Sequence, residues 1–183
     1  MTPTSRRTQS GLTLVEACIT LAVAAIVVGS AAPAMQGLID ARRLEGAATQ
    51  LATDIQFIRS EAVARNEALR LGLPTAAGGG SCYVIHTGSA DGCSCAVAGP
   101  SNGAHCTGDA QPIKTVHVAN AGQVRLQANV ASVLFDPLHG TSSPTGTLRL
   151  VGNSGRAVHH VINVMGRVRS CSPNAAVPGY RAC

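Results

Sequence analysis

A single carboxylate stands at the start of an otherwise apolar N-terminal segment. Glu16 is followed by a charge-free run of 23 residues, Ala17 to Ile39, which as a helix would be about 35 Å long and would span a bilayer. A charge at the centre of a membrane is unfavourable by about 2.5–3.5 kcal/mol, so it is retained mainly where a partner neutralises it. Cleavage after Gly11 would supply that partner, because the new ammonium group of Leu12 would lie one helical turn from Glu16, in the same chain or in a neighbour.

The segment Gly11-Leu12-Thr13-Leu14-Val15-Glu16 resembles the cleavage site of type IV prepilins and type II secretion pseudopilins. The resemblance implies that a prepilin peptidase cuts after Gly11 and methylates the new N-terminus at Leu12. It also implies that Glu16 serves filament assembly. Members of this class usually have Phe after the Gly, and Leu12 keeps the apolar character of that position.

The same segment allows two simpler interpretations. Arg6 and Arg7 favour a cytoplasmic N-terminus by the positive-inside rule, as expected for a prepilin leader. They would also suit an ordinary secretory signal that is cut near Ala32 and Ala34, although Glu16 would interrupt its apolar region. A plain single-pass anchor is the other alternative, and the length of the segment does not separate it from a pilin.

A helical period continues beyond the apolar segment. Apolar or small residues recur at spacings of three and four, which marks one stripe along a helix: Leu44, Ala48, Leu51, Ile55, Ile58 and Ala62. Glu61 and Arg65 make a favourable i,i+4 pair on the polar side. The sequence therefore predicts an amphipathic helix whose apolar stripe faces a globular core.

The ends of this helix are less sharply marked. We expect one helix from Leu12 to about Asn66, interrupted near Pro33, where proline lacks the amide hydrogen. Gly72 and Pro74 mark the latest end. The expected regions are a leader at 1–11, a transmembrane and assembly helix at 12–39, an amphipathic continuation at 40–72 and a periplasmic β-rich domain at 73–183.

Short runs rich in β-branched residues follow, separated by clusters of Gly, Pro, Asn and Ser. They predict strands at 82–86, 114–118, 123–127, 130–135, 147–151, 156–164 and 167–170. Gly152-Asn153-Ser154-Gly155 predicts a hairpin within Leu148 to Val164, because these residues tolerate positive φ angles. Thr75 to Gln111 is expected to be a long loop held by disulfides.

Cysteines indicate an oxidising compartment. Cys18 lies in the apolar segment, and an even set of six follows it: Cys82, Cys93, Cys95, Cys106, Cys171 and Cys183. Downstream of an export signal, such a set predicts a disulfide framework. Cys171 with Cys183 is the pair we expect, whereas the other four cysteines allow three connectivities. Zinc at Cys93, Cys95, His105 and Cys106 is the disfavoured alternative, so we expect neither a metal nor a cofactor.

Three later segments resemble the GspH/FimT family of minor pilins and pseudopilins. They are Arg59-Ser60-Glu61-Ala62-Val63-Ala64-Arg65-Asn66, Phe135-Asp136-Pro137-Leu138-His139-Gly140 and Gly166-Arg167-Val168-Arg169. The resemblance implies an α+β, type IV pilin-like fold, in which the long N-terminal helix packs on a β-sandwich-like set of antiparallel strands. It implies other pilins and the prepilin peptidase as partners. It also implies a single-pass protein of the bacterial inner membrane, with a periplasmic domain, that is extracted into a filament.

Basic residues concentrate towards the C-terminus. From Ala110 to Cys183 seven Lys and Arg residues oppose one aspartate, a net charge of +6, whereas Ser81 to Asp109 carries −2. A basic end suggests a polyanionic partner, for which DNA is the obvious choice in a pilus-like machine. Few aromatic side chains are present to stack on bases, so the contact would be mainly to phosphates.

In the FimT branch of the family, a C-terminal Gly-Arg-x-Arg motif is associated with DNA binding during natural transformation. Gly166, Arg167 and Arg169 match that motif. On an extended strand the two arginines would share one face about 6.6 Å apart, and a Cys171–Cys183 bridge would bring Arg181 near them. The alternative is a solvated edge strand whose arginines discourage aggregation.

No catalytic set can be assembled from the sequence. His159 and His160 are adjacent and would face opposite sides of a strand. We find no combination of nucleophile, base and orienting group, and we expect no enzyme activity. The functions that remain are a filament subunit that binds double-stranded DNA, a GspH-type pseudopilin at the tip of a type II secretion pseudopilus without DNA binding, and a generic membrane-anchored periplasmic domain.

Overall fold

The computed structural model describes residues 13–74, 81–95, 103–118 and 124–183. The predicted cleavage site at Gly11 and Leu12 lies outside the described residues. The chain forms two compact units, Met1–Leu38 and Ile39–Cys183, and helix α1 contributes to both.

Helix α1 runs from Leu14 to Arg65, 52 residues without a break. Thr13 caps its start: the amide of Glu16 donates to the Thr13 hydroxyl at 3.3 Å, the first half of a Thr-x-x-Glu capping box. The predicted interruption at Pro33 is wrong, because the missing amide removes a single hydrogen bond while the neighbouring turns keep theirs.

The end of α1 at Arg65 confirms the expected end at about Asn66 and corrects the bounds of 40–72 given to the amphipathic continuation. Asn66 adopts a left-handed conformation, with a φ of 50°. The amide of Asn66 donates to the carbonyl of Val63 at 3.2 Å, and the amide of Glu67 donates to that of Ala62 at 3.1 Å. These two bonds form a Schellman motif, which satisfies the last carbonyls of a helix and turns the chain away. Leu69–Gly72 is consequently a strand and not helix.

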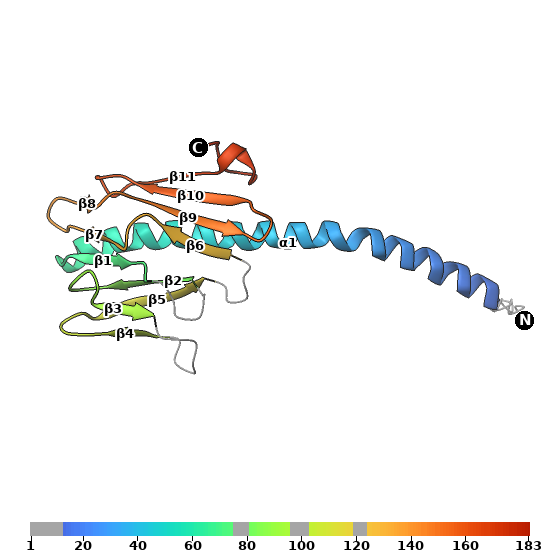
Figure 1. The fold of residues 1–183 in the computed structure, drawn as a ribbon, viewed down its shortest axis with the longest axis horizontal. Helices are drawn as coiled ribbons and strands as arrows, with labels where there is room; N and C mark the ends of the chain where they lie inside the picture. Colours follow the sequence, from blue (N-terminus) through green and yellow to red (C-terminus); the bar gives the residue numbers. More distant parts are fainter. Residues whose placement is uncertain (1–12, 75–80, 96–102, 119–123) are drawn as a thin grey trace, which may run out of the picture. The chain divides into compact units, whose positions relative to one another are not determined.

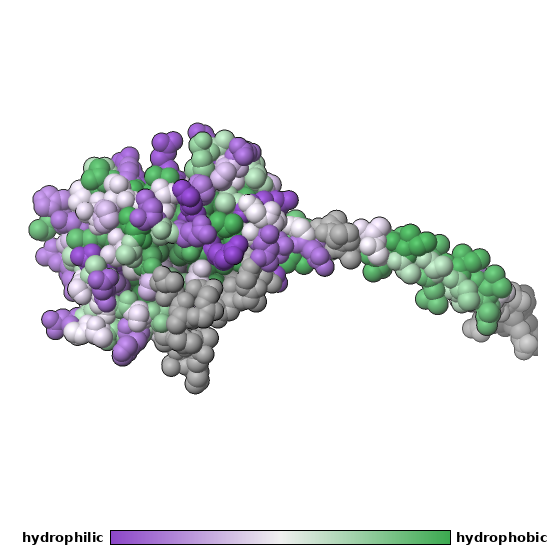
Figure 2. Space-filling model, in the orientation of Figure 1, coloured by the Kyte–Doolittle hydropathy of each residue, from purple (hydrophilic) through white to green (hydrophobic). Residues whose placement is uncertain are grey.

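The N-terminal part of α1 is apolar on its surface. Its mean hydropathy reaches 2.2, and it is the one candidate membrane span among the described residues. Figure 2 shows hydrophobic side chains along this part, several of them more than half exposed: Leu14, Val15, Ile19, Leu21, Ile26 and Val28. An exposed apolar surface of this size is typical of a region that contacts a membrane or another protein.

Two antiparallel sheets build the second unit (Figure 1). The five-stranded sheet has the order β5-β2-β1-β7-β8, and the four-stranded sheet has the order β11-β10-β9-β6. Their strands are β1 Leu69–Gly72, β2 Ser81–His86, β5 Pro112–Val118, β6 Val124–Ala128, β7 Ser132–Phe135, β8 Ser142–Ser143, β9 Gly146–Gly152, β10 Ala157–Ile162 and β11 Val168–Cys171. A separate hairpin pairs β3, Cys93–Cys95, with β4, Ala104–Cys106. The short 3-10 helix η1 is Pro173–Ala175. This architecture confirms the α+β, pilin-like fold class.

All seven predicted strands are present, with ends that differ by a few residues. The β9–β10 hairpin forms around Gly155, whose φ is 75°. The expected loop at Thr75–Gln111 was wrong where the β3–β4 hairpin forms. Those strands are only three residues long, and two of their three cysteines, Cys93 and Cys106, bond across the pair.

One core joins α1 to the inner faces of both sheets. Every residue of the predicted helical stripe is 0–1% exposed: Leu44, Ala48, Leu51, Ile55, Ile58 and Ala62. They pack with side chains from the five-stranded sheet, such as Phe135, and from the four-stranded sheet, such as Leu148 and Leu150. Each buried large aliphatic side chain contributes about 1.5–3 kcal/mol relative to exposure. The predicted stripe is confirmed.

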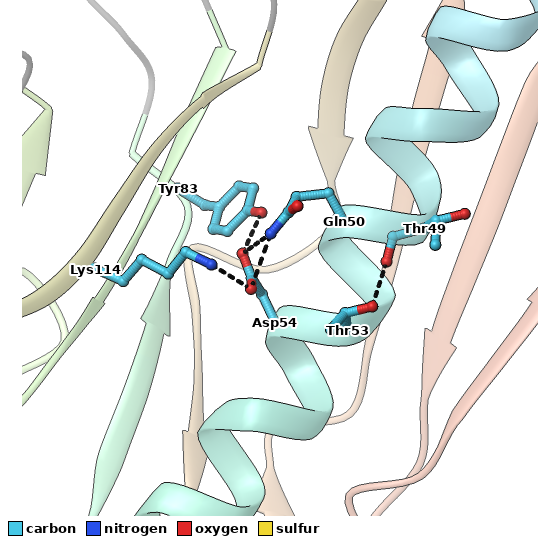
Figure 3. A network of polar contacts seen from close by, with 6 residues as sticks. All are labelled: Thr49, Gln50, Thr53, Asp54, Tyr83 and Lys114. Carbon is cyan, nitrogen blue, oxygen red and sulfur yellow. Dashed lines mark hydrogen bonds and ion pairs between the residues drawn. The ribbon is translucent and has the colours of Figure 1, made fainter.

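A buried carboxylate also fixes α1 to the five-stranded sheet (Figure 3). Asp54 is 2% exposed. It accepts hydrogen bonds from the hydroxyl of Tyr83 on β2 and the ammonium of Lys114 on β5, both at 2.7 Å, and from the Gln50 amide at 3.1 Å. Burial, together with the bond to Asp54, raises the pKa of Tyr83 well above its usual value. The network gives the charge the partners that burial demands.

Candidate nucleic-acid interface

The loop between β10 and β11 holds the Gly-Arg-x-Arg segment in a fixed turn. Gly166 has a φ of 67°, a conformation that glycine adopts without steric cost. Asn163 clamps the loop: its carbonyl accepts from the Gly166 amide at 2.9 Å, and its side-chain oxygen accepts from the Arg167 amide at 2.9 Å. Its own amide donates to the Arg167 carbonyl at 3.1 Å. Arg167 therefore lies in the loop directly before β11, and Arg169 lies on the strand.

The outer face of the four-stranded sheet is basic. Arg149 lies between the buried Leu148 and Leu150 on β9, so its side chain leaves the sheet on the face away from the core. By the same alternation Arg125 on β6 and Arg169 on β11 lie on that face, and all three arginines are exposed. The four strands contain no aspartate or glutamate. The face therefore offers cations to a ligand with no carboxylate from these strands to compete.

The register places these arginines on a diagonal, which we call the arginine diagonal: Arg169, Arg149 and Arg125. Across the sheet, strand pairing aligns Arg169 with Thr147 of β9 and Arg125 with Val151 of β9. Arg149 lies midway between these two positions on β9. At about 4.8 Å between strands and about 3.3 Å per residue, the diagonal is about 20 Å long. It is long enough to contact several phosphates of one nucleic acid.

His159 contributes to the same face. It is paired with Arg149 on one side and with Cys171 on the other. Burial, followed by the nearby charge of Arg149, lowers the pKa of His159. At neutral pH the ring is therefore an uncharged group beside the diagonal.

The C-terminal tail runs along the edge of this sheet. Cys171 and Cys183 form a disulfide, the pair expected from the sequence. The amide of Ser172 donates to the carbonyl of Arg181 at 2.8 Å, so Arg181 lies at the end of β11 that is remote from Arg167. The bridge therefore does not gather all three predicted arginines at one point: Arg181 and Arg167 mark opposite ends of β11, with Arg169 between them.

Arg59 of α1 connects the helix to two loops. Its side-chain atoms lie 3.4 Å from the position that a Cβ would take at Gly166 and 3.9 Å from that position at Gly140. Both glycines have positive φ angles, 67° and 61°. The three segments that carry the family resemblance, around residues 59, 140 and 166, therefore meet in space.

Beside this junction lies a groove of about 720 Å³, here called the α1–β11 groove. One face of α1 lines it with Gln56, Arg59, Ser60 and Val63, and the loop and strand opposite contribute Gly166, Arg167 and Val168. Within the described part of the chain, neither Arg59 nor Arg167 forms an ion pair with a carboxylate. Both guanidinium groups are available to an anion.

The three cysteines of the β3–β4 hairpin are all in disulfides: Cys93 bonds to Cys106 across the hairpin, and Cys95 bonds to Cys82 on β2. They offer no thiolates to a metal, which corrects the zinc alternative. His159, Cys171 and Cys183 also come within ligand distance of one another, but both sulfurs belong to one disulfide.

Comparison with known proteins places the chain in a family. The family model for the type II transport protein GspH matches residues 47–166. The chain belongs to the GspH family. The match includes Arg59, Gly140 and Gly166, and it ends before Arg167, Arg169 and Arg181. No curated protein sequence matches the chain.

Solved structures confirm the fold of this GspH-family protein. The type IV minor pilin FimU of Pseudomonas aeruginosa, strain PAO1, is 21% identical, with a TM-score of 0.53 over 76% of this chain and 95% of FimU. A second crystal form of FimU gives 20% identity and a TM-score of 0.50 over 75% of this chain and 98% of the other. The chain is thus a member of the GspH family with the fold of a type IV minor pilin.

The sequence identified only part of the basic surface. It singled out Gly166, Arg167, Arg169 and Arg181, but it did not single out Arg149, Arg125 or Arg59. Arg149 and Arg125 carry a readable signal, since each stands between two apolar residues of a predicted strand. The contact of Arg59 with Gly140 and Gly166 has no such signal, because only the tertiary fold brings these residues together.

Proposed function

We propose that this protein enters a filament through the N-terminal part of α1, after a prepilin peptidase cleaves at Gly11 and methylates Leu12. In this proposal residues 12–39 cross the bacterial inner membrane before extraction, and the β-rich unit lies in the periplasm. The exposed apolar surface of the helix supports it, because other pilins could cover that surface in the filament. Glu16 would fix the register by pairing with the N-terminal ammonium of a neighbouring subunit.

Replacement of Glu16 tests this assembly role. Glu16→Ala should leave the protein in the inner membrane and sharply reduce its recovery in sheared filaments. Glu45→Ala is a matched control, since Glu45 is a helical carboxylate paired only with Arg42 at 2.9 Å in its own chain. Normal incorporation of the Glu16→Ala protein would contradict the role of Glu16.

We propose further that the β-rich unit binds double-stranded DNA through the arginine diagonal, with Arg167 and Arg181 at its edge. The observation that carries this proposal is a sheet face with three exposed arginines on four strands that contain no acidic residue. Contacts of this kind neutralise phosphates, are insensitive to sequence and weaken as salt rises. Such binding fits a pilus-like machine that takes up DNA.

DNA affinity at several salt concentrations tests this proposal. The full chain in a non-ionic detergent should bind a labelled duplex. Each phosphate contact removed should lower the slope of log affinity against log salt by about 0.9, so Arg167→Gln with Arg169→Gln should lower it by about 1.8. Arg42→Gln is the control, because Arg42 is paired with Glu45. Equal affinity and equal slope in the double variant would reject the site.

A type II secretion role is the second candidate, and the family match favours it, since the matching model describes a type II transport protein. In that role the subunit would lie at the tip of a pseudopilus and would not bind DNA. Secretion assays in a strain that lacks the protein would separate the candidates. Loss of secretion together with unchanged DNA uptake would support the pseudopilus role.

A further inference from the structure

The α1–β11 groove has the charge and the shape of a site for a phosphate chain. Its volume of about 720 Å³ lies within the range of ligand-binding clefts. A guanidinium group stands on each side, Arg59 on the helix and Arg167 in the loop, and neither is paired with a described carboxylate. Exposed cations without acidic neighbours attract anions.

The side chain of Arg59 lies beside two loops. Its aliphatic stem lies beside Gly166: a Cβ at that glycine would be in van der Waals contact with the Arg59 Cδ atom at 3.4 Å and with the Gly140 carbonyl oxygen at 3.5 Å. The positive φ angles at both glycines keep the two loops in this arrangement.

The groove continues into the proposed DNA surface. Arg167 precedes Arg169, the first residue of the arginine diagonal, by two residues, which is about 6.6 Å along an extended chain. A nucleic-acid backbone on the outer face could therefore reach the groove without leaving the basic surface. This continuity favours a phosphodiester backbone over an isolated small anion.

We propose that Arg59 is a further phosphate-binding residue, which with Arg167 holds the DNA backbone in the α1–β11 groove. The inference rests on the proposed DNA binding and extends it from the sheet to the helix. Gly166 acts there as a positioning residue, because its φ of 67° turns the loop beside Arg59. The proposed occupant is duplex DNA, with binding to anionic membrane as an outcome of the test.

Charge-changing variants of Arg59 test the proposal in the full chain, in non-ionic detergent, with the same labelled duplex. Arg59→Gln should weaken binding severalfold and lower the salt slope by about 0.9, the contribution of one phosphate contact. Arg59→Lys, which keeps the charge, should keep the slope. Arg65→Gln is the matched control on the same helix, because Arg65 is paired with Glu61 at 2.7 Å and lies outside the groove.

A second variant keeps the test decisive if Arg59→Gln disturbs folding. Ser60 is exposed in the groove and donates only to the carbonyl of Phe57 in its own helix. Ser60→Glu should place a carboxylate beside Arg59 and weaken DNA binding, whereas Ser60→Gln should not.

The outcomes separate the groove from the DNA proposal itself. Wild-type affinity and slope in both Arg59→Gln and Ser60→Glu, with binding lost in Arg167→Gln/Arg169→Gln, would overturn the role of Arg59 and leave the DNA proposal standing. Wild-type behaviour in all of these variants would overturn both. Binding to vesicles of phosphatidylglycerol that depends on Arg59, without binding to the duplex, would assign the groove to a membrane and overturn the DNA role.

Discussion

The two parts of helix α1 are both rich in apolar residues, yet they differ in where their partners lie. From Leu14 to Leu38 the large apolar side chains are exposed, and the described chain provides no core for them. From Leu44 to Ala62 a stripe of similar residues is buried at 0–1% exposure against two sheets. The apolar side chains of the first part are therefore exposed to a partner outside the described chain. Those of the second part pack in its own core.

The two parts differ in the same way in their acidic residues. Asp54, in the second part, has three partners from its own chain. Glu16, in the first part, forms no ion pair with any described residue. A helical carboxylate among apolar residues indicates that a polar or charged partner is needed. Where the carboxylate is buried, as Asp54 is, the partner lies in the same chain; where it is exposed, as Glu16 is, we expect the partner in another molecule.

The largest expected effect tests the apolar side chains of the two parts. Ile58→Ala should lower the free energy of unfolding of the β-rich unit by about 2–5 kcal/mol, because it opens a cavity in the core. Ile26→Ala, at a position that is 72% exposed, should leave that quantity unchanged. Urea unfolding followed by tyrosine fluorescence measures it, since both tyrosines, Tyr83 and Tyr180, lie in the β-rich unit and the chain has no tryptophan. An equal decrease in the free energy of unfolding in Ile58→Ala and Ile26→Ala would contradict the difference between the two parts of α1.

A smaller effect tests the contact between the second part of α1 and β10. Burial lowers the pKa of His160 to about 4; the Ala48 carbonyl of α1 partly opposes this, and His159 adds to it. The unfolded chain, with a histidine pKa of about 6.5, therefore takes up a proton first as the pH falls. The free energy of unfolding should therefore fall by about 3 kcal/mol in total as the pH decreases from 6.5 to 4.

Unfolding free energies across this pH range check the prediction for His160. His160→Gln should flatten the pH dependence by about the same amount, whatever it does to stability at pH 7. The N-terminal part of α1 contains no histidine, so its membrane insertion should not share this acid sensitivity. If the free energy of unfolding of His160→Gln varied with pH as in the wild type, the His160 ring would not be the cause of the acid sensitivity.

The smallest effect compares the two carboxylates directly. Asp54→Asn should destabilise the β-rich unit by about 1–3 kcal/mol, because Lys114 loses its charged partner and the buried Tyr83 hydroxyl is less well satisfied. Glu16→Gln should change the same free energy by less than about 0.5 kcal/mol while it reduces filament incorporation. A stability loss in Glu16→Gln of the size seen for Asp54→Asn would show that Glu16 has an internal partner.

Much of this fold could be read from local patterns. The stripe from Leu44 to Ala62 follows a period of 3.6, and its burial requires only that one face of a helix meets a core. The β9–β10 hairpin follows from a turn that tolerates positive φ between two alternating runs. The helix was expected to end at about Asn66, with Gly72 and Pro74 as the latest limit, and it ends at Arg65. Asparagine readily takes the left-handed conformation that closes a helix.

Residues of the candidate site could be predicted less well. Arg167 and Arg169 were found through a motif, yet their placement at the start of an edge strand, with Arg181 at its other end, depends on hydrogen bonds to Asn163 and Ser172. Asp54 drew no attention in the sequence, because a carboxylate within an amphipathic helix is ordinary. Its partners Tyr83 and Lys114 are 29 and 60 residues away.

The sequence by itself determined the two-part helix, the strands and the excess of positive charge, because each of these is a property of neighbouring residues. Only the tertiary structure decided which cations act together. Strand register brought Arg125, Arg149 and Arg169 onto one diagonal, and two glycine turns brought loops 26 residues apart in sequence under the side chain of Arg59. Periodicity fixes which face a residue occupies, but proximity between distant segments depends on packing that no local pattern encodes.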